Sequence, residues 1–253
     1  MSNRFLPCSS IFAAFAFSLG MLAWTGAATD EPEYRPALVG NGPASLVNLI
    51  DVQKLLRDGA PDGAVMFSRG VFPPGKGRDF TDIYGSTPGS RSVQNEVLRA
   101  LNRSRFLPAI AHHKAVPVYF RGTVLFFART QPHLRVLANQ NPDALVHFED
   151  FVAPQEIIGT ARWDENDPRL EAITRKNKSS VVTLELHVNE RGKLLSTRVL
   201  SEEPRGYNIG AFERDMLSTA EFVPGFRQSK PCDCSFQMTR AIGLEHYFGP
   251  GSR

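Results

Sequence analysis

Two stretches with one pattern decide the fold: FLPAIAHHK at residues 106–114 and FVPGFRQSK at residues 222–230. Each has Phe, then Pro two places on, a small residue, an apolar residue and a Lys, and counterparts lie 116 positions apart (222 − 106 = 116). Pro lacks an N–H and clashes with the preceding turn, so each stretch is predicted to follow a helix end. The Phe is predicted to anchor that end in a core, and the small residue lets the chain turn back.

In the first half, apolar residues recur at helical or alternating spacing, which predicts helices and strands. The expected elements are a helix at 46–57, strands at 64–72 and 78–84, a helix capped by Ser92 with Val93, Val97, Leu98 and Leu101 as its core face, and a long strand at 116–128.

The second half repeats this order. It predicts an alternating strand at 181–188, a turn at Asn189–Gly192, a return strand at 194–200, a helix capped by Asn208, and a last strand at 235–247. Leu101 and Leu217 also match at the offset of 116. Five matched positions can arise by coincidence, but the matching order of elements favours duplication of one module.

The N-terminus has the three parts of a secretory signal. Arg4 supplies a positive start, residues 11–24 form an apolar run, and Thr25–Ala28 are small residues suited to cleavage. The run is short for a membrane span, although Phe5 and Leu6 could extend it into an uncleaved inner-membrane anchor. Cleavage predicts a periplasmic protein, and retention predicts one anchored in the inner membrane.

Composition narrows the class of protein. Of 253 residues, 42% are apolar and 22% charged, which is ordinary for a globular chain. The net charge is +3, or +2 without Arg4 (3 − 1 = 2), too small to predict a nucleic-acid partner. The basic run at 175–178 is interpreted as a solvated linker. We therefore expect contact with membranes only through the export signal or an uncleaved anchor.

Residues 181–242 resemble the C-terminal domain of TonB, a periplasmic energy-transducer module. The matching residues are Gly192, Val199, Ser201, Pro204, Phe212, Phe222, Pro224, Gly225 and Lys230. Residues 62–128 resemble a second, more divergent copy. The resemblance implies an α+β fold of two small modules, each an antiparallel sheet of about three strands packed by one or two helices.

The resemblance also predicts where the domains of the chain begin and end. We expect a signal peptide at 1–28, an extended leader at 29–45, a first module at 46–130, a connecting segment at 131–178 and a second module at 179–248. The chain lacks the long Pro-rich span of TonB itself, and no Tyr-Pro element precedes Val181. Energy transduction by a TonB-like protein with an uncleaved anchor is therefore an alternative rather than the main hypothesis.

The cysteines Cys232 and Cys234 are the sharpest chemical feature, because they are the only ones left after signal cleavage. Three interpretations stay open: a structural thiol pair or disulfide, a redox pair, and two metal ligands. A disulfide across one residue closes a tight ring and would need a local kink. The counterpart in the first half is Pro117 or Val118, so the shared fold does not require the pair.

Other candidate motifs are incomplete. His112 and His113 could join His133 or His147 in a metal site, but adjacent loop residues usually point apart. Asp164, Asn166 and Asp167 resemble part of a calcium loop without its Gly and closing Glu, and a cap for a helix begun by Pro168 is preferred. No nucleophile, base and orienting acid occur together, so we expect no enzyme activity, no cofactor and no metal.

A binding function fits these observations best. Open sheet edges accept an extended strand from a partner. Strands 118–127 and 236–247 are the candidate docking strands, represented by Val118, Phe120, Val124, Phe236, Met238 and Ala241. Alternatively, these edges pair with each other in one continuous sheet. The sequence thus predicts an exported protein that binds an envelope protein or peptide, with a redox or metal-handling protein as the second hypothesis.

Overall fold

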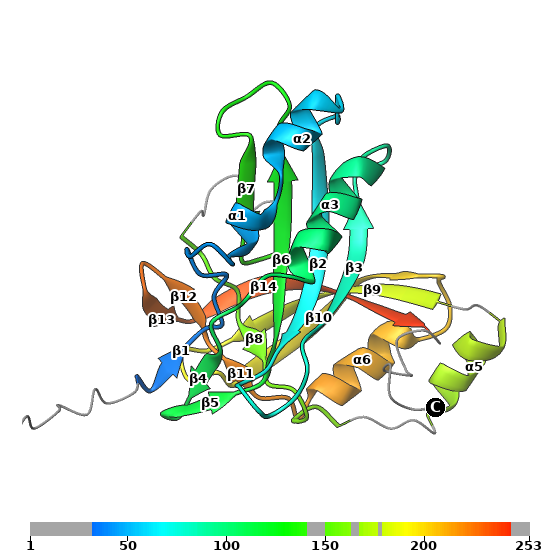
Figure 1. Cartoon of the computed structure of the whole chain (residues 1–253). Helices are drawn as coiled ribbons and strands as arrows, with labels where there is room; N and C mark the ends of the chain where they lie inside the picture. Colours follow the sequence, from blue (N-terminus) through cyan, green and yellow to red (C-terminus); the bar gives the residue numbers. More distant parts are fainter. Residues whose placement is uncertain (1–31, 141–149, 163–166, 177–178, 244–253) are drawn as a thin grey trace, which may run out of the picture. The chain divides into compact units, whose positions relative to one another are not determined.

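The computed structural model describes residues 32–140, 150–162, 167–176 and 179–243 (Figure 1). The expected signal peptide at 1–28 and the end of the last expected strand, at 244–247, lie outside these ranges. The fold is α+β, with small antiparallel sheets and two clusters of buried apolar residues, one beside the main sheet of each half. We call each main sheet with its helices and hairpin a module; Ile157, Val223 and Phe226 of the second module pack in the first cluster. Within the described ranges, every helix is too short or too polar to cross a membrane.

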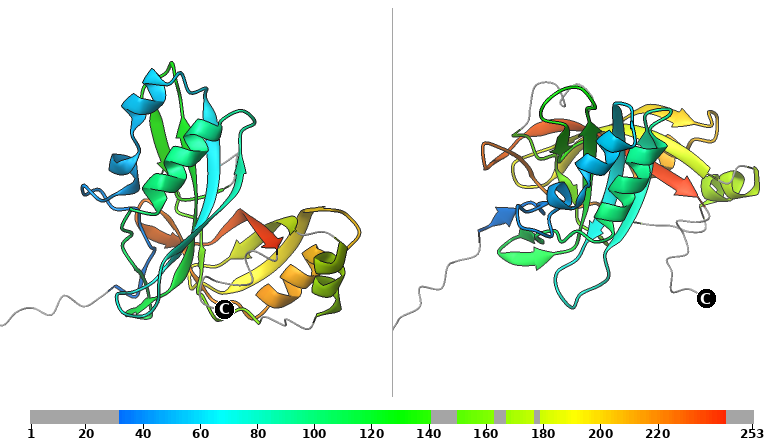
Figure 2. Two further views of the ribbon diagram at one scale, coloured as in Figure 1. Left: turned by 45° about the vertical axis from the view of Figure 1, so that its right-hand side comes forward. Right: turned by 45° about the horizontal axis from the view of Figure 1, so that its top comes forward.

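The first module contains a four-stranded sheet of order β3-β2-β6-β7 and a small sheet of order β1-β4-β5. Helices α1, α2 and α3 lie over one face of the larger sheet (Figures 1 and 2). In chain order the elements are β1 (Tyr34–Arg35), α1 (Leu46–Leu49), α2 (Val52–Arg57), β2 (Gly63–Val71), β3 (Phe80–Ser86), α3 (Arg91–Leu101), β4 (Ala109–Ala111), β5 (Lys114–Val116), β6 (Val118–Phe126) and β7 (Leu134–Leu137).

The second module contains a three-stranded sheet of order β10-β9-β14, with α6 packed on one face. Two short antiparallel pairs accompany it: β11 pairs with β8 of the preceding segment, and β12 pairs with β13 in a hairpin. Its elements are β8 (Gln155–Glu156), α5 (Pro168–Lys176), β9 (Ser179–Val188), β10 (Leu194–Glu203), α6 (Ile209–Leu217), β11 (Phe222–Val223), β12 (Gly225–Arg227), β13 (Lys230–Cys232) and β14 (Cys234–Gly243).

The two modules repeat one arrangement of elements. The strand order β3-β2-β6 matches β10-β9-β14, and in each module a helix and a short hairpin precede the last strand. The hairpin turns have positive φ at His112 and His113 and again at Gln228 and Ser229, 116 positions later (228 − 112 = 116). The shared order of elements predicted from the two exit stretches is therefore confirmed.

The two exit phenylalanines occupy equivalent places, as predicted. Phe106 is 9% exposed and Phe222 is 2% exposed. Phe106 packs edge-on against Phe120 at 5.0 Å between ring centroids, and Phe222 packs edge-on against Phe236 at 6.3 Å. Phe120 and Phe236 are themselves 116 positions apart (236 − 120 = 116), so the same aromatic pair closes each core.

Several expected elements differ in their bounds. The helix expected at 46–57 is two helices, because Asp51 accepts a hydrogen bond from Lys54 N and starts a new helix at Val52. The strand expected at 116–128 is divided at Pro117, which has no N–H to give a ladder. The helix predicted to be capped by Ser92 begins at Arg91, so its cap position is Ser90, two residues earlier (92 − 90 = 2).

Two segments that were predicted to be irregular form β-strands paired with a neighbouring strand. Tyr34 and Arg35, in the expected leader, pair with Ala111 and Ile110 of β4. Within the expected connection, β7 pairs with β6, so the first sheet extends past residue 130 and has four strands rather than about three. Neither short strand has a strong alternating pattern of its own, and both form because a neighbouring strand offers unpaired backbone groups.

In each module, a buried or half-buried charged side chain forms hydrogen bonds with the free backbone groups at one end of a helix. In the first, the Arg69 guanidinium donates to the carbonyls of Leu101 and Ser104 at the C-terminal end of α3. In the second, the Glu202 carboxylate accepts from four backbone N–H groups at the N-terminal end of α6. Burial opposes ionisation of Glu202, but these donors hold its pKa below the ordinary value. Asn208 occupies the cap position without the side-chain bond expected of it.

The hairpin glycine Gly192 fits closely against the exit of α6. Its φ is +77°, and a Cβ added there would lie 1.9 Å from the Phe222 carbonyl oxygen. Gly75 has the same φ of +77° but open space around the Cβ position. The two glycines therefore separate the effect of backbone conformation from the effect of steric contact.

We expect Gly192→Ala to destabilise the protein by about 3–5 kcal/mol, because a left-handed conformation and a clash with backbone add. Gly75→Ala should lose only about 1–2 kcal/mol from its conformation. Urea unfolding followed by circular dichroism measures both. Equal losses in the two variants would contradict the close contact between Gly192 and Phe222.

The burial of the two anchors gives a second expectation. Phe106→Ala and Phe222→Ala should each lower the free energy of unfolding by about 3–5 kcal/mol, because each leaves a cavity in a core. Phe80→Ala is the control, since Phe80 is 38% exposed. A loss at either anchor no larger than that of Phe80→Ala would show that the two exits are not equivalent.

Candidate functional site

The thiol pair lies at the point where the second hairpin leads into the last strand. Cys232 ends β13 and Cys234 begins β14, and both are free thiols. Between them, the Asp233 carboxylate pairs with the His187 ring. At the offset of 116, the counterparts of Cys232 and Cys234 are Val116 and Val118 (232 − 116 = 116, 234 − 116 = 118). Both thiols thus replace apolar residues of the first module.

Cys234 fills space in the second core, where it is 7% exposed. A Cβ added at Gly225 would lie 2.6 Å from its Sγ, so the glycine of the exit stretch makes room for the thiol. The first module has Ala109 and Val118 at these two places. Burial and, to a smaller extent, the neighbouring Cys232 together raise the pKa of Cys234 to about 12. Such a thiol is a poor nucleophile or metal ligand at neutral pH.

The histidines and acidic residues that were considered as metal ligands form a turn and a helix cap instead. His112 and His113 form the hairpin turn, and His112 contacts the Tyr34 hydroxyl. Asp167 accepts hydrogen bonds from Arg169 at the start of α5, as the capping hypothesis predicted. In the part of the chain that the structure describes, no three metal-ligating side chains come together. His147, Asp164 and Asn166 lie outside that part.

The first predicted docking strand is wrong. β6 pairs with β2 along its length and with β7 over Thr123–Phe126, and the side chains of Val118, Phe120 and Val124 are fully buried. These residues form the first core instead of an open edge. The error follows from treating the segment after residue 130 as a connection, because that segment supplies β7.

The second predicted docking strand is an edge, but it is not open throughout. β14 lies at the edge of its sheet, in a different sheet from β6, so the alternative of one continuous sheet is also wrong. Phe236 and Met238 point into the second core, and Ala241 is half-buried. On the outer side, the Thr239 N–H donates to the Gln140 side chain. Gln140 therefore occupies the middle of this edge.

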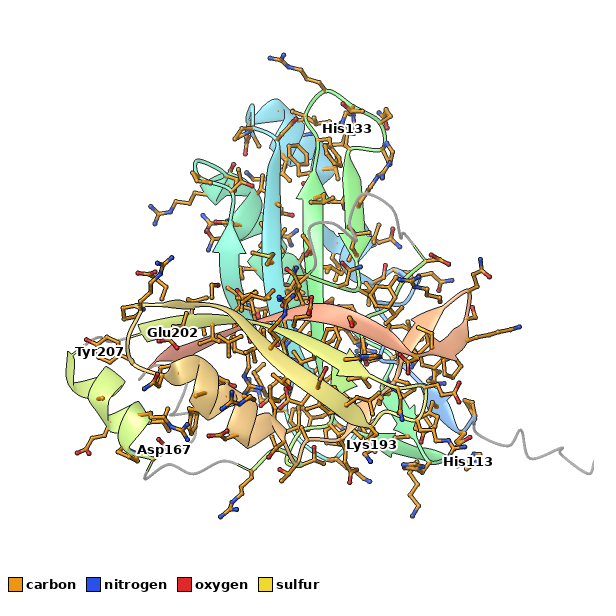
Figure 3. The ribbon with its side chains drawn as sticks, turned by 180° about the vertical axis from the view of Figure 1, so that it is seen from behind. His113, His133, Asp167, Lys193, Glu202 and Tyr207 are labelled. Carbon is orange, nitrogen blue, oxygen red and sulfur yellow. The ribbon has the colours of Figure 1, made fainter. Side chains whose placement is uncertain are left out.

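The opposite edge of the same sheet, β10, has more exposed apolar side chains than β14. Among the described residues, no strand pairs with its outer side. Leu195 is 50% exposed and Leu200 is 37% exposed, each at a shift in the register with β9. Figure 3 shows this strand between Lys193 and Glu202. By alternation of the ladder, Thr197 and Val199 direct their N–H and C=O groups outward.

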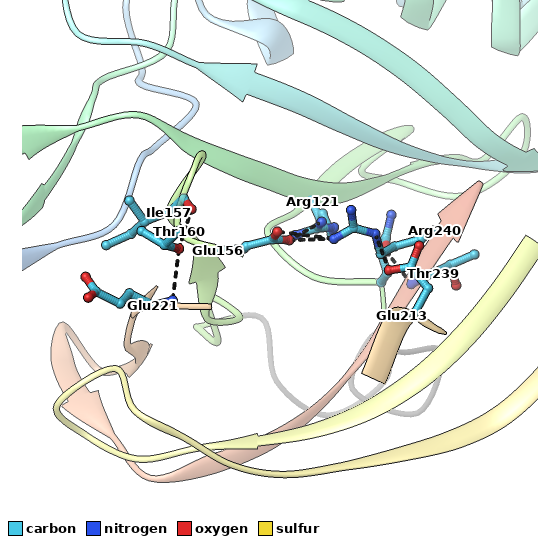
Figure 4. A network of polar contacts seen from close by, with 9 residues as sticks. Arg121, Glu156, Ile157, Thr160, Glu213, Glu221, Thr239 and Arg240 are labelled. Atoms are coloured by element: carbon cyan, nitrogen blue, oxygen red, sulfur yellow. Dashed lines mark hydrogen bonds and ion pairs between the residues drawn. The ribbon is translucent and has the colours of Figure 1, made fainter. Parts of the chain in front are cut away.

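A buried cluster of charges joins the modules, and sequence analysis missed it (Figure 4). The Glu156 carboxylate of β8 accepts a hydrogen bond of 2.9 Å from Arg121 of β6 and bonds of 2.9 and 3.2 Å from Arg240 of β14. The Arg240 Nε lies 2.9 Å from a carboxylate oxygen of Glu213 on α6. The exposed side-chain fractions are 6% for Arg121, 2% for Glu156, 15% for Arg240 and 0% for Glu213.

The two carboxylates of this cluster have unequal surroundings. Burial alone would raise the pKa of Glu156, yet Arg240 and Arg121 together hold it below the ordinary value. Burial raises the pKa of Glu213 against the attraction of Arg240. Neither oxygen of Glu213 has a hydrogen bond within the described residues, and the Arg121 Nε and Nη1 atoms also have none there. Glu156 therefore accepts three hydrogen bonds from the two arginines, whereas Glu213 is held by its ion pair with Arg240.

Two glutamine side chains add polar links across the same junction. Gln140 donates to the Phe67 carbonyl of β2 and accepts from Thr239 of β14. Gln155 of β8 forms two bonds with the Ala37 backbone, at 2.7 and 3.0 Å. Each glutamine is 3% exposed. Sequence alone offered one signal for these contacts: a charged residue, Arg121 or Arg240, within a strand of mainly apolar residues. A charge in such a strand is buried only when it is paired.

Comparisons with family models, with curated proteins and with solved structures return no match to this chain.

The different surroundings of Cys232 and Cys234 predict that the two thiols react at different rates with an alkylating reagent. In the native protein at pH 8, iodoacetamide should modify Cys232 and leave Cys234 unmodified, because at a pKa of about 12 only about one Cys234 in ten thousand is a thiolate. Both should react after unfolding in urea. Mass spectrometry of the peptides distinguishes them. Rapid native modification of Cys234 would instead favour the redox or metal-handling hypothesis.

Proposed function

We propose that this protein is an exported, non-enzymatic binding protein with two TonB-C-like modules, which takes an extended segment of an envelope protein or peptide on the free edge of β10. The order of elements in each half supports the resemblance: strand, hairpin, return strand, helix, exit through Phe-x-Pro and last strand. The export step rests on the signal pattern at 1–28.

The observation that carries this proposal is the outer side of β10, with which no strand of the described ranges pairs. Unpaired N–H and C=O groups on an edge strand form hydrogen bonds with an added strand, and side-chain contacts give specificity. Leu195 and Leu200 supply two exposed apolar contacts beside these groups. Their register shifts leave Ser196–Val199 as the regular stretch between them. We therefore expect a short added strand, centred on Thr197 and Arg198.

The alternatives have less support from the described residues. A redox or metal-handling function needs an accessible thiolate, whereas Cys234 is buried with a raised pKa. Energy transduction needs a retained anchor, and residues 1–28 lie outside the described ranges. The mature N-terminus separates the cases, because a start near Ala28 would exclude the anchor.

Blocking the edge tests the proposal. Thr197→Pro should abolish partner binding, because it removes an outward N–H and places a ring on the edge, with little effect on pairing with β9. Gln237→Pro is the matched control, since its N–H points outward from β14. A photo-crosslinker at Leu195, used in cells that make the protein, should give one adduct of defined mass that Thr197→Pro removes.

Circular dichroism and thermal unfolding must show that both proline variants keep the fold. Loss of the adduct in Gln237→Pro but not in Thr197→Pro would place binding at β14 and contradict the proposed edge. An adduct unaffected by either substitution would contradict strand addition altogether.

A further inference from the structure

A small pocket lies at the Lys193 end of β10, where the proposed docking edge begins (Figure 3). Its volume is about 260 Å³, and its apolar lining includes Leu194, Ala220 and Phe222, of which the last two are buried. Sites for drug-sized ligands have volumes of roughly 300–1,000 Å³. This pocket therefore suits the end of a polypeptide chain better than a whole small molecule.

The outer side of the strand is closed at this pocket. Lys193 ends the hairpin turn that joins β9 to β10, so one of its sides faces β9. On the other side, Lys193 forms an antiparallel bridge with Glu221, and the Phe222 N–H donates to the Gly192 carbonyl. This short segment occupies the edge position just ahead of β10. A strand added to the edge of β10 must therefore stop before it.

The direction of that short segment determines which end of a partner would meet it. The bridge is antiparallel, so residues 220–222 run in the opposite direction to β10. A strand added beside Thr197 and Val199 lies in line with them. An added strand antiparallel to β10 runs towards Leu195, and its C-terminal end meets Ala220. In the parallel orientation, the N-terminal end of the partner lies there instead.

Charge favours one of these two orientations. The pocket is lined by the basic side chains of Arg191 and Lys193 and by one carboxylate, that of Glu221. Within the described residues, neither basic side chain forms an ion pair, whereas Arg198 on the strand itself is paired with Glu185. A lining with a net positive charge attracts a carboxylate and repels an N-terminal ammonium group.

We propose that this pocket holds the C-terminal carboxylate of the partner, so that the protein takes the end of an extended chain, antiparallel to β10, rather than an internal segment. The inference rests on the proposed function, because it requires strand addition to β10. Lys193 and Arg191 contact the carboxylate, and the apolar lining at Leu194 and Ala220 contacts the last side chain. The partner is thus an envelope protein or peptide whose chain ends in an apolar residue.

Two peptide libraries separate capture of a chain end from strand addition in general. In the first, short random segments end in a free carboxylate on the carrier protein. In the second, the same segments are followed by a fixed spacer. We expect the protein to select binders from the first library only, and Thr197→Pro should lose them. The best binder, synthesised as the acid and as the amide, should bind about tenfold more tightly as the acid, the usual scale for a hydrogen bond to a charged group.

Variants of the basic side chains locate the carboxylate. The double variant Arg191→Gln, Lys193→Gln should bind the acid about tenfold more weakly and the amide as well as the wild type does. Its thermal midpoint should not change, because both side chains are exposed. Arg205→Gln is the matched control, since Arg205 is exposed just beyond the opposite end of β10, and it should leave both affinities unchanged.

The outcomes distinguish failure of this inference from failure of the proposed function. Binders from both libraries, or equal affinities for the acid and the amide, would overturn capture of the chain end and leave strand addition in place. A loss in Arg205→Gln as large as that in the double variant would place the carboxylate at the other end of β10 and overturn the pocket. Peptides that bind Thr197→Pro as well as the wild type, or no binders from either library, would contradict docking at β10 itself.

Discussion

The Glu156 carboxylate is the contact on which the junction between the modules depends. It accepts hydrogen bonds from arginines of two different sheets, one on β6 and one on β14. Hydrophobic burial favours contact between two cores but specifies no direction, whereas a buried carboxylate between two guanidinium groups requires defined positions. Gln140 and Gln155 add directional bonds on the same junction. The polar contacts therefore determine how the strands of one module meet those of the other.

Each module completes one end of its helix with a charged side chain, but the two modules do so at opposite helix ends. In the first, a buried arginine, Arg69, completes the C-terminal end of α3, where backbone carbonyls are exposed. In the second, Glu202 completes the N-terminal end of α6, where backbone N–H groups are exposed. One arrangement of strands and helix is thus compatible with a charged contact at either end of the helix.

Periodicity and the exit stretches predicted most of the fold. Alternation identified β9, and the Phe-x-Pro pattern identified both helix ends, because these signals are local to the chain. The short strands β1 and β7 could not be predicted, since each forms only where another strand leaves backbone groups unpaired. The predicted edge at β6 failed for the same reason. The cluster around Glu156 was also hidden, because its members come from β6, β8, α6 and β14, and no local pattern connects them.

The exchange of Ala109 and Val118 for Gly225 and Cys234 has a consequence for how such modules diverge. A methyl group at position 225 would fall 2.6 Å from the sulfur at position 234, so the two sites share one volume. Ala109 and Val118 are nevertheless each larger than Gly225 and Cys234, so the first module provides more space at this corner. Replacing Gly225 and Cys234 by Ala and Val would therefore overfill the second core unless the neighbouring chain moved. The two modules keep the same strand order with differently spaced backbones at this corner.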